Sequence, residues 1–365
     1  MVHDKTVRIG DFFKIKFRWL VNYGWRGVFI VRLLKVAVGG FLMFGLVTNA
    51  LAVQYTSPRG GNDLIGRMQV IKAKYEDTFA DLGDTYSLGY SQLVAANPGV
   101  DAWLPGTGTD ILLPTRYILP DAPRTGVIIN LPEYRLYYYP KDGKTVYTFP
   151  LGIGREGWSS PLGNTKIVGK VKDPTWTPPA SIRKEHAKDG DILPAVVPAG
   201  PDNPLGPYKM QLGFSGYLIH GSNQKFGVGT RTSHGCFRML NPDVTFLYSI
   251  LPMGTNVNIV TQPYKIGIED GKIYFEAHQA LDEHPAPDLH KFLNDFLAKH
   301  GNNPKFIIDY SVAQLVAEHH DGIPVQIGNT EGIPVKQPVK EVATTQANDQ
   351  VDTAGQTGTE ISHEN

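Results

Sequence analysis

Short runs of β-branched and aromatic residues, separated by glycine and proline, recur through the middle of this chain and constrain its fold most strongly. Four such runs lie at 127–130, 135–139, 146–149 and 257–260. Runs of this length and composition are typical of β-strands, and the glycines and prolines between them favour turns. Regularly spaced short strands predict an all-β sandwich or barrel, which we place at residues 124–262.

Two stretches inside this region depart from the strand pattern. Residues 154–210 are rich in proline and glycine, and we expect them to form a lid and the walls of a cleft rather than core strands. Residues Pro242 to Leu251 predict a helix, because Asn241 is a good cap and proline is favoured at the first helical position.

A small α+β module is predicted at residues 68–115. A strand near Val70 is followed by a helix that is capped at Asp77-Thr78 and runs to Leu82. A second helix over 90–96 and a closing strand over 111–114 complete the module.

A second small α+β segment is predicted at residues 263–327. It begins with a hairpin that turns at Asp270-Gly271. Amphipathic helices are expected over 289–300 and 311–319.

The two ends of the chain have different compositions from the rest. An apolar run over 36–47 leads to an A-x-A pattern at 50–52 and is short for a membrane span of ~20 residues. We therefore expect a signal peptide over 1–52, or an N-terminal anchor if it is not cleaved. Residues 53–67 are polar and glycine-rich and predict a linker, and 328–365 lack apolar periodicity and predict a disordered tail.

The chain has a single cysteine, Cys236, which cannot form an internal disulfide. It ends the sequence Ser233-His234-Gly235-Cys236, and His220 lies sixteen positions upstream. A histidine within about 3 Å can take the proton of a thiol and generate the thiolate that attacks carbonyl carbon. A lone cysteine can also be a buried structural residue, but these neighbours favour a nucleophile.

The pair His220-Gly221, followed by Ser233-His234-Gly235-Cys236, resembles the active-site signature of the L,D-transpeptidases. These are the YkuD-type cysteine acyltransferases of bacterial cell walls. Residues 125–139 resemble the opening β-hairpin of that family. Residues 193–204 and 217–221 resemble its periplasmic, Gram-negative (ErfK/YbiS-like) branch. The resemblance covers about residues 55 to 320.

The resemblance implies a mainly β protein with a YkuD-type β-sandwich catalytic domain. Residues 68–115 resemble a LysM module, a small glycan-binding fold, with Glu76 where that family usually has glycine. Whether this module binds glycan or only packs against the catalytic domain stays open. We expect that it can be removed without loss of Cys236 reactivity, unless it packs on the β domain.

We assign Cys236 as the nucleophile and His220, which ends the strand run 217–219, as the general base. The resemblance implies that a backbone carbonyl at Gly221 orients His220. His234 is a competing base, but some relatives carry serine there, so we expect a helper. The N–H groups of Gly235 and Cys236 are expected to stabilise an oxyanion.

Three further residues are expected to bind substrate. Arg238 has a planar guanidinium suited to a carboxylate, and peptidoglycan stems end in carboxylates. Ser233 and Tyr217 flank the two parts of the motif.

A metal site is not expected. His220, His234 and Cys236 could together bind zinc, but no second cysteine completes a structural site. The other histidines considered lie in the C-terminal part of the chain, at His278, His284, His290, His319 and His320. We expect no cofactor. Lysine plus arginine equals aspartate plus glutamate, at 35 each, which gives no sign of nucleic-acid binding.

The resemblance implies a reaction on peptidoglycan. Cys236 would attack the carbonyl between the third and fourth residues of a tetrapeptide stem and release D-alanine. An amine of another stem, giving a 3-3 cross-link, or a lysine of an outer-membrane lipoprotein would then resolve the thioester. The resemblance also implies inhibition by carbapenems and, with the signal peptide, a periplasmic location.

Two alternatives stay open. A hydrolase of the same fold would let water resolve the thioester, as an L,D-carboxypeptidase or as an amidase that detaches lipoprotein. A non-catalytic adaptor would bind the cell wall through the LysM-like module alone.

Overall fold

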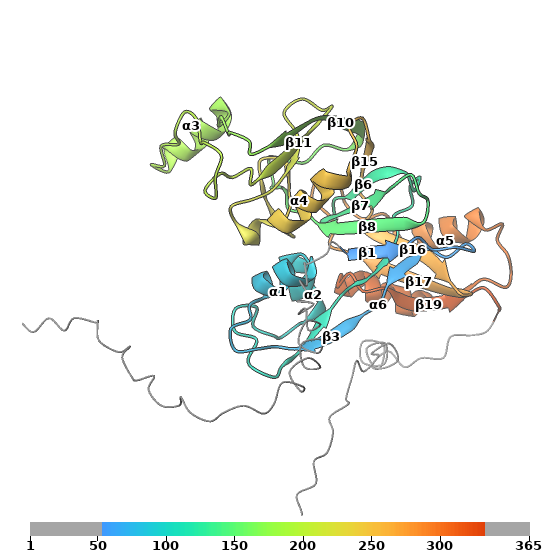
Figure 1. Cartoon of the computed structure of the whole chain (residues 1–365). Coiled ribbons are helices and arrows are strands. Elements are labelled where there is room, and N and C mark those ends of the chain that lie inside the picture. The colour runs from blue at the N-terminus through green and yellow to red at the C-terminus, as the bar shows by residue number, and fades with distance from the viewer. Residues whose placement is uncertain (1–52, 333–365) are drawn as a thin grey trace, which may run out of the picture. The chain divides into compact units, whose positions relative to one another are not determined.

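The computed structural model describes residues 53–332, and its largest element is a nine-stranded sheet (Figure 1). We call it the catalytic sheet. Its strands, in spatial order, are β1 (Val53–Thr56), β8 (Thr145–Pro150), β7 (Arg135–Tyr139), β6 (Gly126–Asn130), β15 (Asn256–Val260), β10 (Gly163–Lys172), β11 (Tyr208–Leu212), β12 (Leu218–His220) and β14 (Phe237–Arg238). Neighbours are antiparallel except β6–β15 and β12–β14, which are parallel. The prediction of a mainly β protein is confirmed.

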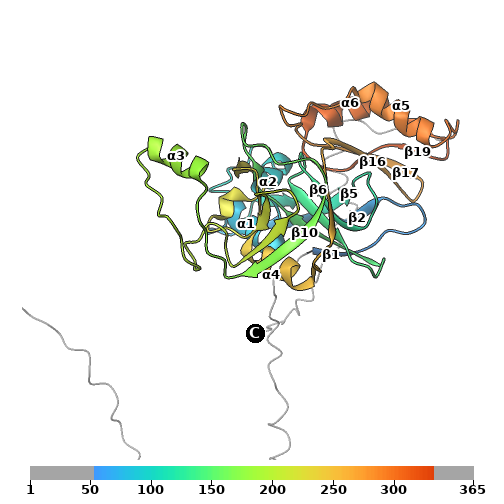
Figure 2. The ribbon, with the colours of Figure 1, turned by 90° about the horizontal axis from the view of Figure 1, so that it is seen from above.

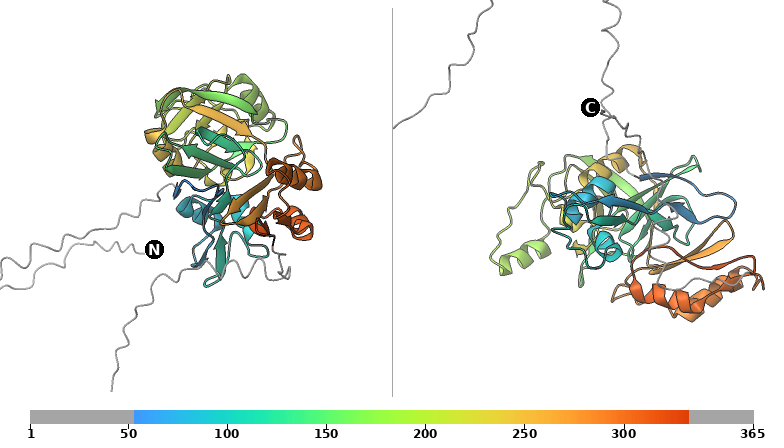
Figure 3. Two further views of the ribbon diagram at one scale, coloured as in Figure 1. Left: turned by 90° about the vertical axis from the view of Figure 1, so that its right-hand side faces the viewer. Right: turned by 90° about the horizontal axis from the view of Figure 1, so that it is seen from below.

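The catalytic sheet curls around a hydrophobic core (Figure 3). Successive strand side chains point to opposite faces, so Val127 and Ile129 of β6 enter this core while Ile128 packs on the other side. The helix α4 (Asn241–Ile250) contributes Val244 and Leu247 to the same core. Burial on both faces explains why β6 is a continuous apolar run rather than an alternating one.

Two predictions about this region are wrong. Residues 53–67 are not a linker, because β1 pairs with β8 and β2 (Leu64–Gly66) pairs with β5 (Arg116–Ile118). At three or four residues each, these strands are too short to show a period. The stretch 154–210 does contain core strands. Its ten-residue strand β10 has Ile167 as its one buried residue, so apolar periodicity could not reveal it.

The helix predicted at 242–251 begins one residue earlier than expected. The N-cap of α4 is Leu240 rather than Asn241. The Asn241 side chain instead accepts a hydrogen bond from the N–H of Ser222, at 2.9 Å. Pro242 does lie in the first turn.

We call residues 69–113 the N-terminal module. The predicted strand–helix–helix–strand order is present, as β3 (Gln69–Lys72), α1 (Phe79–Tyr86), α2 (Tyr90–Ala96) and β4 (Asp110–Leu113). Thr78 caps α1 by accepting from the N–H of Asp81, and α1 continues four residues beyond the predicted Leu82. The two helices and two strands enclose a small core that includes Phe79 and Leu93.

The N-terminal module is fastened to the segment between His220 and Cys236. The N–H groups of Tyr90 and Ser91 donate to the carbonyls of Val228 and Gly229, each at 3.3 Å. Lys225, in the short 3-10 helix η1 (Lys225–Gly227), forms ion pairs with two acidic residues of α1. The module therefore helps to position this segment of the active-site region.

Inside the molecule, the module and the catalytic sheet share buried polar contacts. The guanidinium of Arg135, in β7, is fully buried, donates to Gln92 of α2 and lies over the ring of Tyr117. The hydroxyl of Ser87 donates to Asp243 of α4 at 2.8 Å. These contacts agree with the alternative in which the module packs on the β domain.

The C-terminal segment forms a separate four-stranded sheet covered by two helices (Figure 2). Its strands are, in spatial order, β16 (Tyr264–Glu269), β17 (Lys272–Ala277), β19 (Val325–Asn329) and β18 (Ile307–Ile308), and its helices are α5 (Leu289–Lys299) and α6 (Tyr310–His319). The predicted hairpin is confirmed, with positive φ angles of 48° at Asp270 and 77° at Gly271. Both predicted helices are present.

The predicted tail does not begin at 328, because β19 continues to Asn329 and pairs with β17 and β18. The rest of that tail, from 333, lies outside the described residues, as does the predicted signal peptide over 1–52. Among residues 53–332, no helix has the length and apolar character needed to span a membrane.

Residues 173–207, which we call the α3 segment, leave the catalytic sheet between β10 and β11. At their neck, Trp176 and Val197 exchange two backbone hydrogen bonds, of 2.9 and 2.8 Å. The helix α3 (Ala180–Lys188) has no buried residue and stands away from the strands (Figures 2 and 3). This part of the predicted lid therefore has few contacts to hold it.

Candidate active site

Two parallel strands at the edge of the catalytic sheet bring the predicted catalytic residues together. In β12 and β14, Ile219 lies opposite Phe237 and His220 lies opposite Arg238. Ile219 and Phe237 are fully buried. Because side chains alternate along a strand, His220, Cys236 and Arg238 share the other face of this strand pair.

The imidazole of His220 is buried and held by its neighbour in the chain. Its Nδ1 lies 2.6 Å from the carbonyl oxygen of Gly221. A carbonyl can only accept a hydrogen bond, so Nδ1 carries the proton and Nε2 is left with a lone pair. Burial, with the positive charge of Arg238, lowers the pKa of His220 to about 4. The imidazole is therefore neutral at neutral pH.

Gly221 is required where it lies. A Cβ at this position would lie 2.5 Å from Oδ1 of Asn241 and 3.0 Å from Cδ of Pro207. A larger residue would push the chain away and move the carbonyl that orients His220. The resemblance implied this contact between Gly221 and His220, and the structure contains it.

Cys236 is partly exposed, and its thiol faces the backbone of the strand β12 and the turn before it. Its Sγ lies 3.6 Å from the carbonyl oxygen of Gly216. Burial raises the pKa of Cys236, although a hydrogen bond from the N–H of Leu218 opposes that shift. At neutral pH, the thiol of Cys236 and the imidazole of His220 are therefore both neutral, and the hydrogen bond of Sγ goes to Gly216 rather than to His220.

The turn before Cys236 is fastened by Ser233. The buried Ser233 hydroxyl donates to the carbonyl of Cys236 at 2.6 Å and accepts from the N–H of Gly235 at 3.1 Å. Gly235 has a φ of +100°, and a Cβ there would lie 2.9 Å from the ring of Tyr217.

These contacts correct two sequence predictions. Ser233 is not placed to bind substrate, because it is buried and its hydroxyl is already satisfied inside the turn. The N–H of Gly235 is not free to stabilise an oxyanion, since Ser233 accepts it. The N–H of Cys236 has no acceptor within residues 53–332, so it remains the available donor of the two.

Arg238 and Tyr217 are the other predicted substrate-binding residues. The guanidinium of Arg238 donates to the hydroxyl of Thr232 at 3.3 Å and forms no ion pair with any carboxylate in residues 53–332. Burial lowers its pKa, and its charge is felt by both His220 and Cys236. The ring of Tyr217 is partly buried against Gly235.

The side chain of His234 contacts residues that the sequence did not single out, and these contacts do not suit a general base. Its Nε2 lies 3.0 Å from Oε2 of Glu185 and 3.1 Å from Nη2 of Arg155. The ring also packs edge-on against Trp158, with centroids 4.9 Å apart. Burial lowers the pKa of His234. Glu185 lies 49 positions before His234, so no local motif could reveal this contact.

One cluster of potential metal ligands lies away from the thiol. Ligand atoms of Glu133, Glu276 and His278 lie within 4.8 Å of one another, in the interior. The ammonium of Lys265 lies 2.9 Å from Glu133 and 2.7 Å from Glu276. This lysine supplies the positive charge that the two buried carboxylates need, so the cluster fits a buried ion-pair network better than a metal site.

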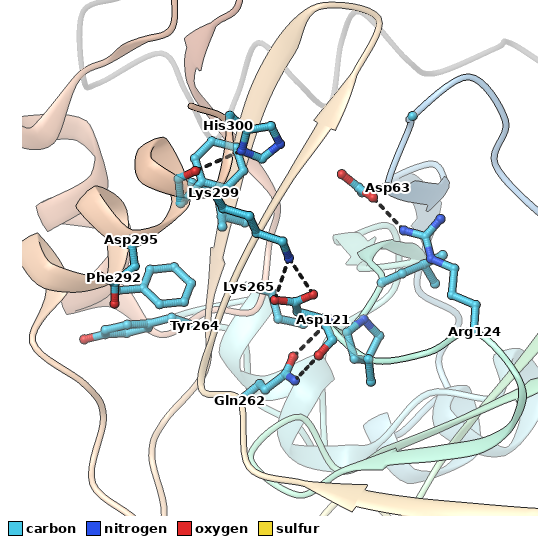
Figure 4. Close-up of a pocket in the computed structure, with 16 residues that line it drawn as sticks. Asp63, Asp121, Arg124, Gln262, Tyr264, Lys265, Phe292, Asp295, Lys299 and His300 are labelled. Carbon is cyan, nitrogen blue, oxygen red and sulfur yellow. Dashed lines mark hydrogen bonds and ion pairs between the residues drawn. The ribbon is translucent and has the colours of Figure 1, made fainter. Parts of the chain in front are cut away.

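A cavity of about 500 Å³ lies where the loop before β6 meets β16 and α5 (Figure 4). Four of its charged lining residues form two ion pairs, Lys299 with Asp121 and Arg124 with Asp63. None of its lining residues belongs to the cysteine motif. The chemistry predicted from the sequence therefore lies at the edge of the catalytic sheet and not in this cavity.

Comparison with known proteins identifies the family of this chain. Residues 124–259 match the family model of the YkuD L,D-transpeptidase catalytic domain. Three relatives come from Escherichia coli. The probable L,D-transpeptidase YbiS is 43% identical over 69% of this chain and 83% of its own length. The probable L,D-transpeptidase ErfK/SrfK is 38% identical over 79% of this chain and 94% of its own length. The probable L,D-transpeptidase YcfS is 37% identical over 77% of this chain and 90% of its own length. The chain described here belongs to the L,D-transpeptidase family.

Proposed function

We propose that this protein is a peptidoglycan L,D-transpeptidase in which Cys236 is the nucleophile and His220 is its general base. The observation that carries the proposal is the arrangement of β12 and β14. It places a partly exposed thiol and a buried imidazole with a bare Nε2 on one face of the strand pair. The chain matches most of the length of relatives that are named probable L,D-transpeptidases, which supports the same activity.

The first half of the reaction forms a thioester. Nε2 of His220 takes the thiol proton as Sγ attacks the carbonyl carbon between the third and fourth stem residues. The N–H of Cys236 is the donor available to the developing oxyanion. The carbon–nitrogen bond then breaks, and His220 returns the proton to the amine of the leaving D-alanine.

The second half regenerates the thiol. An acceptor amine attacks the thioester carbonyl and loses a proton to Nε2 of His220, which passes it to the departing Sγ. No free thiolate accumulates at rest, because burial raises the pKa of Cys236 while that of His220 is lowered to about 4. Proton transfer must therefore accompany the attack.

Arg238 is proposed to bind a carboxylate of the donor stem. Its guanidinium lies next to His220 in the strand pair and has no acidic partner among the described residues. An unpaired, half-buried guanidinium is suited to a bidentate contact with a carboxylate.

We propose an amine as the acceptor, from a second stem or from a lipoprotein lysine, and water as the acceptor in the alternative hydrolase. A wall-binding adaptor without catalysis is less consistent with a base, a thiol and a cation gathered on one strand pair.

Two further proposals concern the module and the location. The N-terminal module has large apolar side chains on its loops, with Tyr75 86% exposed and Leu104 73% exposed, which supports contact with cell-wall glycan. The apolar run and A-x-A pattern near the N-terminus support export to the periplasm.

The test is mass spectrometry of purified tetrapeptide muropeptides after incubation with the protein. Cross-linked dimers with loss of D-alanine are the expected products, tripeptides alone would indicate the hydrolase, and lipoprotein adducts would identify a lysine acceptor. Cys236→Ala should lower turnover to less than about one per cent of wild type, because the chain has no other thiol. Turnover above that level would contradict the assignment.

A further inference from the structure

The contact between α3 and the cysteine motif has the geometry of a carboxylate in a binding site. The two oxygens of Glu185 have different partners: Oε1 contacts Nη2 of Arg155, and Oε2 lies 3.0 Å from Nε2 of His234. Within residues 53–332, Glu185 makes the only side-chain hydrogen bonds that join α3 to the catalytic sheet and its loops.

The two partners of Glu185 are fixed to the cysteine motif. Arg155 follows β9 (Ile153–Gly154), which pairs with β13 (Arg231–Ser233), and its N–H donates to the carbonyl of Ser233 at 3.0 Å. His234 is two residues from Cys236. The guanidinium of Arg155 is also close enough to Arg238 to contribute to the lowering of its pKa, after the larger effect of burial.

The carboxylate of Glu185 is held loosely compared with these partners. The side chains of Arg155 and Glu185 are 35% and 32% exposed, and ion pairs this open to solvent contribute little to stability. No residue of α3 is buried, so packing does not hold the helix in place. A carboxylate from outside the chain could therefore replace that of Glu185.

Arg155 and His234, which we call the cradle, can also satisfy each other's hydrogen bonds after Glu185 leaves. Nε2 of His234 donates to Glu185 when it carries the proton, and it can accept from Arg155, 3.1 Å away, when it does not. It cannot do both at once. A change of histidine tautomer would thus leave neither Arg155 nor His234 unpaired in the exchange.

We propose that Arg155 and His234 form a carboxylate-binding subsite beside Cys236, and that Glu185 occupies it until a donor stem binds. This inference rests on the proposed function, because the ligand is a carboxylate of the peptide stem. Stems offer such a group at their C-terminus and, where the third residue is a diamino diacid, on its side chain. With Arg155 as a second cation near Arg238, the site suits a donor stem that carries both carboxylates.

The test measures binding rather than turnover, so that it is independent of the reaction. Full-length Cys236→Ala protein is titrated with three tetrapeptides: the free acid, the form amidated at the third-residue side chain, and the form amidated at the C-terminus. We expect one of the two amidated peptides to bind about tenfold or more weakly than the free acid, because a charge-assisted contact is lost.

Variants made in the same Cys236→Ala background identify the residues responsible. Arg155→Gln should weaken binding of the free acid by the same factor, so that the free acid and the discriminated amide bind with equal affinity. Arg155→Lys should restore part of the lost affinity for the free acid. Glu185→Gln should increase the affinity for the free acid about two- to fivefold, because it removes the competing carboxylate. It should leave the affinity for that amide unchanged. Asp189→Asn is the matched control, since it removes an exposed carboxylate at the end of the same helix without touching the cradle.

Two outcomes would overturn the subsite. One is that Arg155→Gln weakens the binding of all three peptides equally, or of none, and the other is that Glu185→Gln weakens the binding of the free acid. D-alanine release by the wild-type protein is measured separately. Arg155-dependent binding without any release would keep the subsite and reject the proposed reaction, whereas release without Arg155-dependent binding would do the reverse.

Discussion

The N-terminal module and the α3 segment both contact the region around Cys236, but they are attached in opposite ways. The module contributes backbone hydrogen bonds to Val228 and Gly229 and buried polar contacts to Arg135 and Asp243. The α3 segment has no buried residue in its helix and touches the cysteine motif through the partly exposed carboxylate of Glu185 and through the ring of His186, whose centroid lies 6.4 Å from that of His234. The difference separates a structural support from a displaceable cover.

Because of this contrast, we expect removal of the module to lower the stability of the fold far more than removal of α3. Loss of the module would expose buried charge and apolar surface in the catalytic sheet. Loss of the part beyond the backbone pair of Trp176 and Val197 would expose little, because no residue of α3 is buried. The predictions below test that contrast, from the largest expected effect to the smallest.

Deleting residues 53–118 should prevent folding. The deletion removes the edge strand β1 and leaves the buried guanidinium of Arg135 without Gln92 and Tyr117. Uncovering a buried charge costs about 3–5 kcal/mol, which is a large part of a typical protein's stability. Replacing residues 177–196 by Asn-Gly should leave the melting temperature within a few degrees, since a two-residue turn can close the pair Trp176–Val197. Circular dichroism melts of both variants provide the measurement.

A well-folded deletion variant with reactive Cys236 would show that the module is only an accessory. Collapse of the 177–196 replacement would show that the α3 segment supports the catalytic sheet.

Gly229→Ala should lower the free energy of unfolding by about 3 kcal/mol or more. Its φ is +77°, and a Cβ there would collide with the backbone of Gly89 in the module. Gly190→Ala, in the α3 segment, is the matched control. Its φ is +79° and a Cβ would meet nothing within 4 Å, so only the backbone cost of ~1–2 kcal/mol applies. Urea denaturation measures both, and equal losses would mean that the module does not press on this loop.

Asp243→Asn should stabilise the protein, and it should do so more at pH 8 than at pH 5. Burial raises the pKa of Asp243 to about 7, well above its ordinary value in an unfolded chain. The stability linked to this group is therefore full at low pH and is lost as pH rises through about 7. The rise from 3.8 to about 7 corresponds to a loss of at most about 4 kcal/mol above pH 7, of which roughly a third is already present at pH 5. Urea denaturation at the two pH values measures it, and a larger effect at pH 5 would reverse the sign.

The sequence contains a motif that marks candidate site residues, but it carries little signal for their surroundings. Cys236 and His220 could be identified because glycine, histidine and cysteine gather in a motif that resembles a known family. The strand β10 could not, since Ile167 is its one buried residue and alternation gives no signal. Arg155 and Glu185 were missed for a different reason. Their roles come from a contact across 30 residues that only the tertiary structure brings together.

Some errors came from assigning a role without knowing what each group already contacts. The motif predicted Ser233 as a substrate-binding residue and the N–H of Gly235 as an oxyanion donor, yet the two groups bond each other within the turn. A sequence does not show which hydrogen bonds a turn uses internally.

The rate of acyl-enzyme formation on Cys236 tests the central claim most directly. Wild type, His220→Ala and His234→Ser are mixed with tetrapeptide, and the thioester on intact protein is followed by mass spectrometry. We predict that His220→Ala lowers the rate about a hundredfold or more, the usual contribution of a positioned base, while His234→Ser lowers it less than about tenfold. A larger loss in His234→Ser than in His220→Ala would contradict the assignment of His220 as the base.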